Sequence, residues 1–185
     1  MKDKTDQIIK ASISVFVKKG YLGATTKEIA EKANVAEVTL YRKFGTKQNL
    51  FDYSVKSVTE NKFSEVLDFD EEKSTNDFFK QLLDNRLIVI SKNIKVVRML
   101  ISESLSGNLP KELRFTYVIF NNVSLSIKKY FEANKIEYDY QTYSKIIGGI
   151  LLGYAILPNE KSYHKLEELD KEKYLSKYLE IIVNK

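Results

Sequence analysis

The sequence predicts an all-α protein with a small basic N-terminal head and a larger helical body. Only two prolines and seven glycines interrupt its 185 residues, and apolar residues recur at helical spacing along nearly the whole chain. Residues 1–50 carry ten Lys and Arg against five Asp and Glu, whereas the remaining residues carry twenty of each. This asymmetry predicts a polyanion contact near the N-terminus, with a solvated basic face as the alternative.

The head begins with an amphipathic helix expected over residues 4–19, which Gly20 ends. Thr25 and Glu28 have the spacing of a capping box, so a second helix is expected over residues 26–33. Asn34 tolerates the left-handed conformation that ends this helix. The sequence therefore predicts a helical head whose second helix is short and buries small residues.

A third helix is expected over residues 37–43, burying Leu40 and Phe44. Thr46 then caps a connector helix over residues 47–67. Five further helices are expected at 75–91, 94–105, 109–133, 139–157 and 165–183. The sequence thus predicts about nine helices in two domains, residues 1–46 and residues 47–185.

Composition argues against most catalytic chemistry. Cysteine is absent and His164 is the single histidine, which we interpret as a surface or helix-start residue. The sequence contains no glycine-rich phosphate loop, metal-ligand cluster or nucleophile paired with a base. We therefore expect no enzyme activity, no cofactor and no metal. Without an apolar run of membrane length or a leader-like stretch, we expect a cytoplasmic protein with no membrane partner.

The second and third helices have the proportions of a DNA-binding helix-turn-helix, with a three-residue turn between them. The third helix has little apolar surface to bury. It nevertheless carries Thr39, Tyr41, Arg42 and Lys43, which are suited to base edges and phosphates. This combination indicates binding to double-stranded DNA.

The same residues resemble the signature of the tetracycline-repressor (TetR) family of transcription factors. The matching segments are Thr25–Ala30, Ala33–Ala36, Thr39–Phe44 and Lys47 with Leu50 and Phe51, within about residues 5–52. Two positions depart from the family pattern: Asn34 replaces the usual glycine, and Ala36 replaces a frequent serine cap. Loss of that cap typically costs about 0.5–2 kcal/mol.

The resemblance implies a homodimeric repressor that binds a palindromic operator, with its heads in successive major grooves about 34–36 Å apart. It implies phosphate contacts for four residues, Thr26, Lys27, Tyr41 and Lys47. It assigns base reading to Glu37, Val38, Thr39 and Arg42, with Lys43 suited to either purpose. Arg42 is the main expected specificity determinant because a guanidinium pairs with both acceptors of guanine.

The resemblance further implies that the body binds an unidentified small-molecule inducer and dimerises through its last two helices. Inducer binding would swing the fourth helix and change the separation of the heads. The residues expected near the ligand are Arg86, Met99, Glu103, Tyr117, Phe120, Asn121 and Tyr143. Those expected at the dimer interface are Gly149, Leu152, Gly153, Leu175, Tyr178, Leu179 and Ile182. For both sets, burial within one subunit is the alternative.

Two other functions remain as alternatives at this point. The first is a helical adaptor whose basic head binds acidic protein partners. The second is an enzyme that uses tyrosines and carboxylates of the body as acid and base. Salt-sensitive binding with a preference for duplex DNA separates DNA binding from the adaptor.

Overall fold

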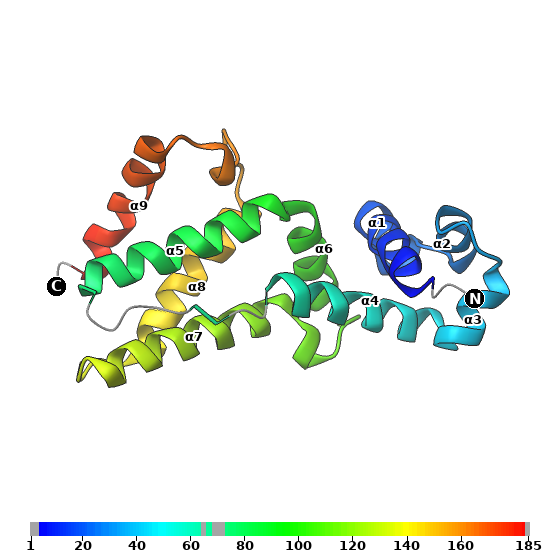
Figure 1. The fold of residues 1–185 in the computed structure, drawn as a ribbon, viewed down its shortest axis with the longest axis horizontal. Coiled ribbons are helices and arrows are strands. Elements are labelled where there is room, and N and C mark those ends of the chain that lie inside the picture. Colours follow the sequence, from blue (N-terminus) through cyan, green and yellow to red (C-terminus); the bar gives the residue numbers. More distant parts are fainter. Residues whose placement is uncertain (1–3, 64–65, 68–72, 184–185) are drawn as a thin grey trace. The chain divides into compact units, whose positions relative to one another are not determined.

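The computed structural model describes residues 4–63, 66–67 and 73–183. This described part contains nine α-helices and two short 3₁₀ helices, and no strand occurs in it (Figure 1). The predicted all-α fold is therefore confirmed. Contacts group the chain into two compact units: residues 1–63 with 95–117, and residues 64–94 with 118–185. The predicted functional division after residue 46 stays a prediction.

The first unit, here called the head unit, is built on a core between α1 and α4. It contains α1 (Thr5–Gly23), α2 (Thr26–Lys32), α3 (Glu37–Phe44), α4 (Lys47–Lys62), most of α6 (Ile94–Leu105) and η1 (Lys111–Leu113). Helix α1 packs against α2 and α4, and α3 packs against α2 and α4 (Figure 1). Phe16 and Phe51 are fully buried, with ring centroids 4.7 Å apart. These aromatic contacts fix α1 on α4.

Gly20 interrupts α1 where the sequence predicts its end. Its backbone has φ 69° and ψ 176°, a conformation that is accessible essentially to glycine alone. A further short helical stretch continues to Gly23, so non-helical Gly20 separates two helical stretches at a kink. The predicted stop at Gly20 is thus a kink.

Two predicted helix boundaries in or beside the head unit are wrong. Helix α4 ends at Lys62 rather than at residue 67, and Phe63 is a buried non-helical residue beyond it. Residues 64–65 lie outside the described residues. The helix expected from residue 109 begins only at Phe115, because Pro110 is extended with ψ 150° and η1 precedes α7. Leu109 is buried in the core. The chain therefore leaves the core through Pro110 and η1 before α7 begins.

The second unit, here called the body unit, is organised around α5. It contains α5 (Thr75–Lys92), most of α7 (Phe115–Ala133), α8 (Tyr140–Ile156), η2 (Tyr163–Lys165) and α9 (Glu168–Val183). Helices α8 and α9 and the short η2 all pack against α5 (Figure 1). Its core includes Phe78, whose ring stacks on that of Tyr130 at 4.0 Å. A central helix with three neighbours needs an apolar surface on several sides, which α5 supplies.

The last helix starts at Glu168, not at residue 165 as predicted. Tyr163 is fully buried: its hydroxyl donates to Asp84 Oδ1 (2.6 Å) and its amide donates to the Tyr154 hydroxyl (2.9 Å). The His164 amide donates to Ser91 Oγ at 3.1 Å. These bonds hold residues 163–165 as a separate turn on α5 and α8, and His164 has a structural position within that turn.

No helix in the described residues is long and apolar enough to cross a membrane. Within the same residues, no group of His, Asp and Glu side chains is arranged to hold a metal ion.

Candidate nucleic-acid interface

Helices α2 and α3 are set by local capping and by one tight turn. The Thr25 hydroxyl accepts from the Glu28 amide (3.2 Å), as the capping box predicts. Asn34 adopts φ 48°, the left-handed turn expected of it, and Val35 N donates to Ala30 O at 3.0 Å. Gln7 from α1 donates to Ala33 O at 2.7 Å and satisfies a carbonyl at the end of α2. The two helices are thereby held in a fixed relation.

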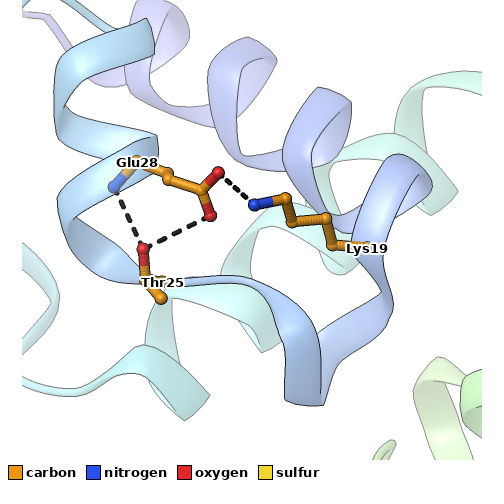
Figure 2. A network of polar contacts seen from close by, with 3 residues as sticks. All are labelled: Lys19, Thr25 and Glu28. Atoms are coloured by element: carbon orange, nitrogen blue, oxygen red, sulfur yellow. Dashed lines mark hydrogen bonds and ion pairs between the residues drawn. The ribbon is translucent and has the colours of Figure 1, made fainter.

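A polar network ties the start of α2 to α1 (Figure 2). The Lys19 ammonium forms an ion pair with the Glu28 carboxylate, which also accepts from the Thr25 hydroxyl at 3.4 Å. The hydrogen bond from Lys19 lowers the pKa of Glu28 and outweighs the opposing effect of desolvation, and the charge of Lys19 and the hydrogen bonds with Thr25 add smaller effects that also lower it. The capping box thus also connects α2 with α1.

Helix α3 buries one side chain and presents most others to solvent. Leu40 is buried and Phe44 is half-buried, so the expectation for Phe44 holds only in part. Val38 is 70% exposed and Tyr41 is 50% exposed. Arg42 and Lys43 are exposed, and Thr39 is half-buried. This is an unusual surface for a helix that only supports a fold, since large apolar and cationic groups share it.

Three of the predicted DNA-contacting residues touch one another. Thr26 Oγ1 donates to Glu37 Oε1 at 2.6 Å and lies 3.2 Å from the Tyr41 hydroxyl. Thr26 is buried and Glu37 is half-buried. Glu37 therefore turns toward α2 in this structure, although the sequence assigns it to the base-reading face.

The two predicted phosphate-binding lysines have different surroundings. Lys27 is exposed at the start of α2. The Lys47 ammonium lies 4.6 Å from the centre of the Tyr21 ring and 3.4 Å from Leu22 O, to which it donates. Lys47 is thus placed at the end of α1, and the contact with Tyr21 orients its charge.

Sequence reasoning missed an anchor between α1 and α6 inside the head unit. The Glu103 carboxylate is buried, accepts from the Tyr21 amide at 2.9 Å and accepts from Asn108 Nδ2 at 2.7 Å. The sequence names Glu103 only as a ligand candidate, because a pairing across more than eighty residues leaves no local signal. In the structure the Glu103 carboxylate links α6 to the end of α1.

The predicted ligand-binding residues divide between the two units. Met99 and Glu103 line an open cleft of about 360 Å³ between α1 and α6, whose rim carries Lys95 and Arg98. Tyr117 is exposed in the head unit. In the body unit Arg86 is buried, Phe120 and Tyr143 are half-buried, and Asn121 is exposed. Tyr143 stacks with Phe79 at 5.5 Å, which places it in an aromatic cluster.

The predicted dimer residues also divide, in this case by burial. Leu175, Leu179 and Ile182 are buried within the single chain, so packing of α9 in one subunit accounts for their apolar character. Gly149 is exposed, and Leu152, Gly153 and Tyr178 are half-buried. Among the described residues, and apart from chain neighbours and the nearby backbone of α8 itself, no atom lies within 4 Å of a Cβ built at Gly149 or Gly153. Among the predicted dimer residues, the three on α8 and Tyr178 on α9 therefore leave surface for a partner.

Comparison with known proteins identifies the head. Residues 8–53 match the family model of the bacterial regulatory proteins of the tetR family. The chain is 40% identical over 83 residues to the uncharacterized HTH-type transcriptional regulator YvkB of Bacillus subtilis. That match covers 45% of the chain and 41% of YvkB, so the chain aligns with under half of that relative's length.

Two longer similarities extend into the body. The chain is 27% identical over 149 residues to IcaR of Staphylococcus aureus, the HTH-type negative transcriptional regulator of the biofilm operon icaADBC, with 77% of each protein covered. The structure superposes on a bacterial regulatory protein of the tetR family from Rhodococcus RHA1 with a TM-score of 0.74. That pair is 16% identical, and 98% of each chain is covered. Residues 8–53 therefore belong to the tetR family of bacterial regulatory proteins, and the fold of the chain is that of a solved protein of the same family.

Proposed function

We propose that this protein is a homodimeric repressor that binds a palindromic operator and is released by a small-molecule inducer. The observation that carries the proposal is the surface of α3, which buries Leu40 while exposing Val38, Tyr41, Arg42 and Lys43. A helix that reads the major groove needs this division between one buried anchor and several exposed groups. The similarity to the negative regulator IcaR supports repression.

The proposed DNA contacts divide into phosphate binding and base reading. Lys27, Lys47, Thr26 and Tyr41 would position the head on the backbone, because hydroxyl and ammonium groups bind phosphates without regard to sequence. Val38, Thr39, Arg42 and Lys43 would lie along the groove, with Arg42 donating to a guanine. Glu37 differs from these residues because its carboxylate accepts a hydrogen bond from Thr26 in the structure.

The proposed dimer uses the exposed surface of α8. Ile146 is 40% exposed and Ile156 is 55% exposed, and Gly149, Leu152 and Gly153 lie between them. Glycines without neighbours within 4 Å leave room for close approach of a second helix. This surface supports a self-complementary contact between two copies.

The proposed inducer contacts are assigned within each unit separately. Met99, Glu103 and Tyr117 belong to the head unit, and Arg86, Phe120, Asn121 and Tyr143 belong to the body unit. The head unit contains α6 as well as α4, and Glu103 joins α6 to Tyr21, so we infer that α6 shares with α4 the transfer of a ligand-induced movement to α1. A true inducer must weaken operator binding, and operator must weaken inducer binding by the same factor.

The test is a fluorescence anisotropy titration of the purified chain. The ligands are a palindromic duplex selected from random DNA and a scrambled duplex, each at several salt concentrations. The parent is compared with Tyr41→Ala and Arg42→Ala, and Lys177→Ala, an exposed cation of the body unit, is the control. We expect Tyr41→Ala to weaken both duplexes. Arg42→Ala should mainly reduce the preference for the selected one, by about 1–3 kcal/mol.

Each alternative outcome has a definite meaning. Salt-sensitive binding without sequence preference, or binding to acidic proteins in place of duplex DNA, would support the adaptor and contradict the regulator. Binding that survives both α3 substitutions would show that α3 does not read DNA. A loss of the same size in Lys177→Ala would mean that net charge, and not the helix-turn-helix, causes the attraction.

A further inference from the structure

The hydroxyls of Thr26 and Tyr41 form a directed chain that ends on the Glu37 carboxylate. Thr26 Oγ1 lies 2.6 Å from Glu37 Oε1 and 3.2 Å from the Tyr41 hydroxyl oxygen. A threonine hydroxyl has one proton, and a carboxylate only accepts. Thr26 therefore donates to Glu37, and Tyr41 donates to Thr26. Both hydroxyl protons are already engaged within the protein.

The acceptor at the end of this chain has the chemistry of a phosphate. A carboxylate and a phosphodiester are both anions that offer two oxygens to hydroxyl donors, and bonds to an ionised acceptor are stronger than neutral ones. Glu37 reaches this position from the first residue of α3, while Thr26 is the first residue of α2. The short distance of 2.6 Å is typical of a charge-assisted hydrogen bond.

We propose that the Glu37 carboxylate competes internally with a DNA phosphate for the hydroxyl pair of Thr26 and Tyr41. The inference rests on the DNA binding proposed above. A duplex gains the phosphate contact at these hydroxyls only when Glu37 turns away. Once displaced, the Glu37 carboxylate regains a hydrogen bond on DNA that offers an amino donor, such as cytosine N4 in the major groove. On other base sequences the displaced Glu37 carboxylate has no such donor, and its negative charge lies beside the DNA phosphates.

Glu37 therefore determines specificity mainly by weakening the binding of unsuitable DNA. Displacing Glu37 from Thr26 weakens the binding of every duplex. A base sequence that offers a donor to Glu37 restores part of the lost binding free energy. This differs from a simple base-reading role, in which Glu37 only strengthens the binding of one sequence. The two roles predict opposite effects of removing its charge.

The test compares Glu37→Gln with the parent in the anisotropy titration, using the scrambled and the selected duplex. We expect Glu37→Gln to bind scrambled duplex about tenfold more tightly, since a hydrogen bond to a charged group is lost from the competing state. The gain for the selected duplex should be smaller. Weaker or unchanged binding of scrambled duplex by Glu37→Gln would overturn the proposal.

A second background separates competition at the hydroxyls from a general effect of charge. Tyr41→Phe keeps the half-exposed ring and removes one hydroxyl, and Thr26→Val removes the other. If Glu37 competes for these hydroxyls, the gain from Glu37→Gln shrinks in both backgrounds. An undiminished gain would refute competition. Circular dichroism shows whether each variant is folded. If Thr26→Val does not fold, the Tyr41→Phe background alone provides the test.

Glu31→Gln is the matched control, because Glu31 is exposed on α2 and carries the same charge. Its effect should be small and equal in the parent and Tyr41→Phe backgrounds. An effect as large as that of Glu37→Gln would overturn the proposal. If the parent itself shows no salt-sensitive binding of duplex, the proposed function fails first. If the parent binds and only the Glu37 results disagree, this inference alone is refuted.

Discussion

Ala36 precedes α3 with a backbone that suits a capping residue and a side chain that cannot cap. Its φ of −70° and ψ of 141° lie in the extended region typical of this position, and no side chain caps α3. We expect Ala36→Ser to stabilise the head by about 0.5–2 kcal/mol, because a serine hydroxyl can accept from an amide in the first turn of α3. Urea unfolding measures this difference.

Thr46→Ala provides the opposite change for comparison. The Thr46 hydroxyl accepts from Asn49 N at 3.0 Å, so its loss should destabilise α4 by about 1 kcal/mol. If Ala36→Ser does not raise the stability while Thr46→Ala lowers it, Glu37 in the first turn of α3 already replaces the missing cap.

Gly20 combines backbone strain with a close neighbour. A side chain at Gly20 would lie 3.0 Å from Glu103 Oε1, in a backbone region open essentially to glycine. We expect Gly20→Ala to lower the free energy of unfolding by about 2–3 kcal/mol, since both the backbone and the Glu103 anchor must shift. Thermal unfolding of the purified variant checks this.

Gly107→Ala separates the two causes. Gly107 also has positive φ, but no atom of the described part of the chain, apart from its chain neighbours, lies within 4 Å of the added Cβ. The excess destabilisation of Gly20→Ala over Gly107→Ala contains the contact with Glu103 and the cost of the ψ of 176° at Gly20. Equal destabilisation would mean that Glu103 does not hold the kink of α1.

At the scale of elements, the short η2 depends on a buried tyrosine. Burial raises the pKa of Tyr163 well above its usual value, and the hydrogen bond to the Asp84 carboxylate raises it further. A raised pKa in the folded state means that the stabilisation is complete below the unfolded pKa of about 10 and is lost as pH rises through the folded value.

Tyr163→Phe should therefore change the alkaline stability profile. At neutral pH it loses a hydrogen bond to a charged group, which costs about 1.5–3 kcal/mol. Above pH about 10 the parent loses the contribution of Tyr163 in addition to any loss that it shares with the variant, so the difference in stability between the two narrows. Tyr138→Phe, at an exposed position, is the control. A constant difference across this pH range would show that Asp84 and burial do not perturb Tyr163.

At the scale of the whole molecule, the proposed assembly depends on α8. We expect light scattering to give twice the mass of one chain for the parent. Gly149→Lys adds a long cation at a site with no neighbours in the single chain, so the chain should fold but dissociate. Leu22→Lys, at another exposed apolar position outside the body unit, should remain dimeric. A monomeric parent, or a dimeric Gly149→Lys, would contradict the proposed interface.

The elements of the head could be predicted because their signals are local. Thr25, Asn34 and Thr46 act on residues within a few positions of themselves, through caps and one left-handed turn. The same holds for the helical spacing of buried residues such as Ile9 and Phe16. The predicted boundaries failed where a distant partner decided, as at η2, where Asp84 and Tyr154 hold Tyr163.

The sequence by itself determined the helical class, the helix-turn-helix and the family, because periodicity, capping and a short motif are properties of neighbouring residues. Tertiary structure alone decided which predicted residues face solvent. It buried Leu175, Leu179 and Ile182 within one chain and left Gly149 open on α8. It also turned Glu37 onto Thr26 and engaged Glu103 with Tyr21. Such pairings depend on which helices pack together, and the free energy of packing is shared among residues that are far apart in the chain.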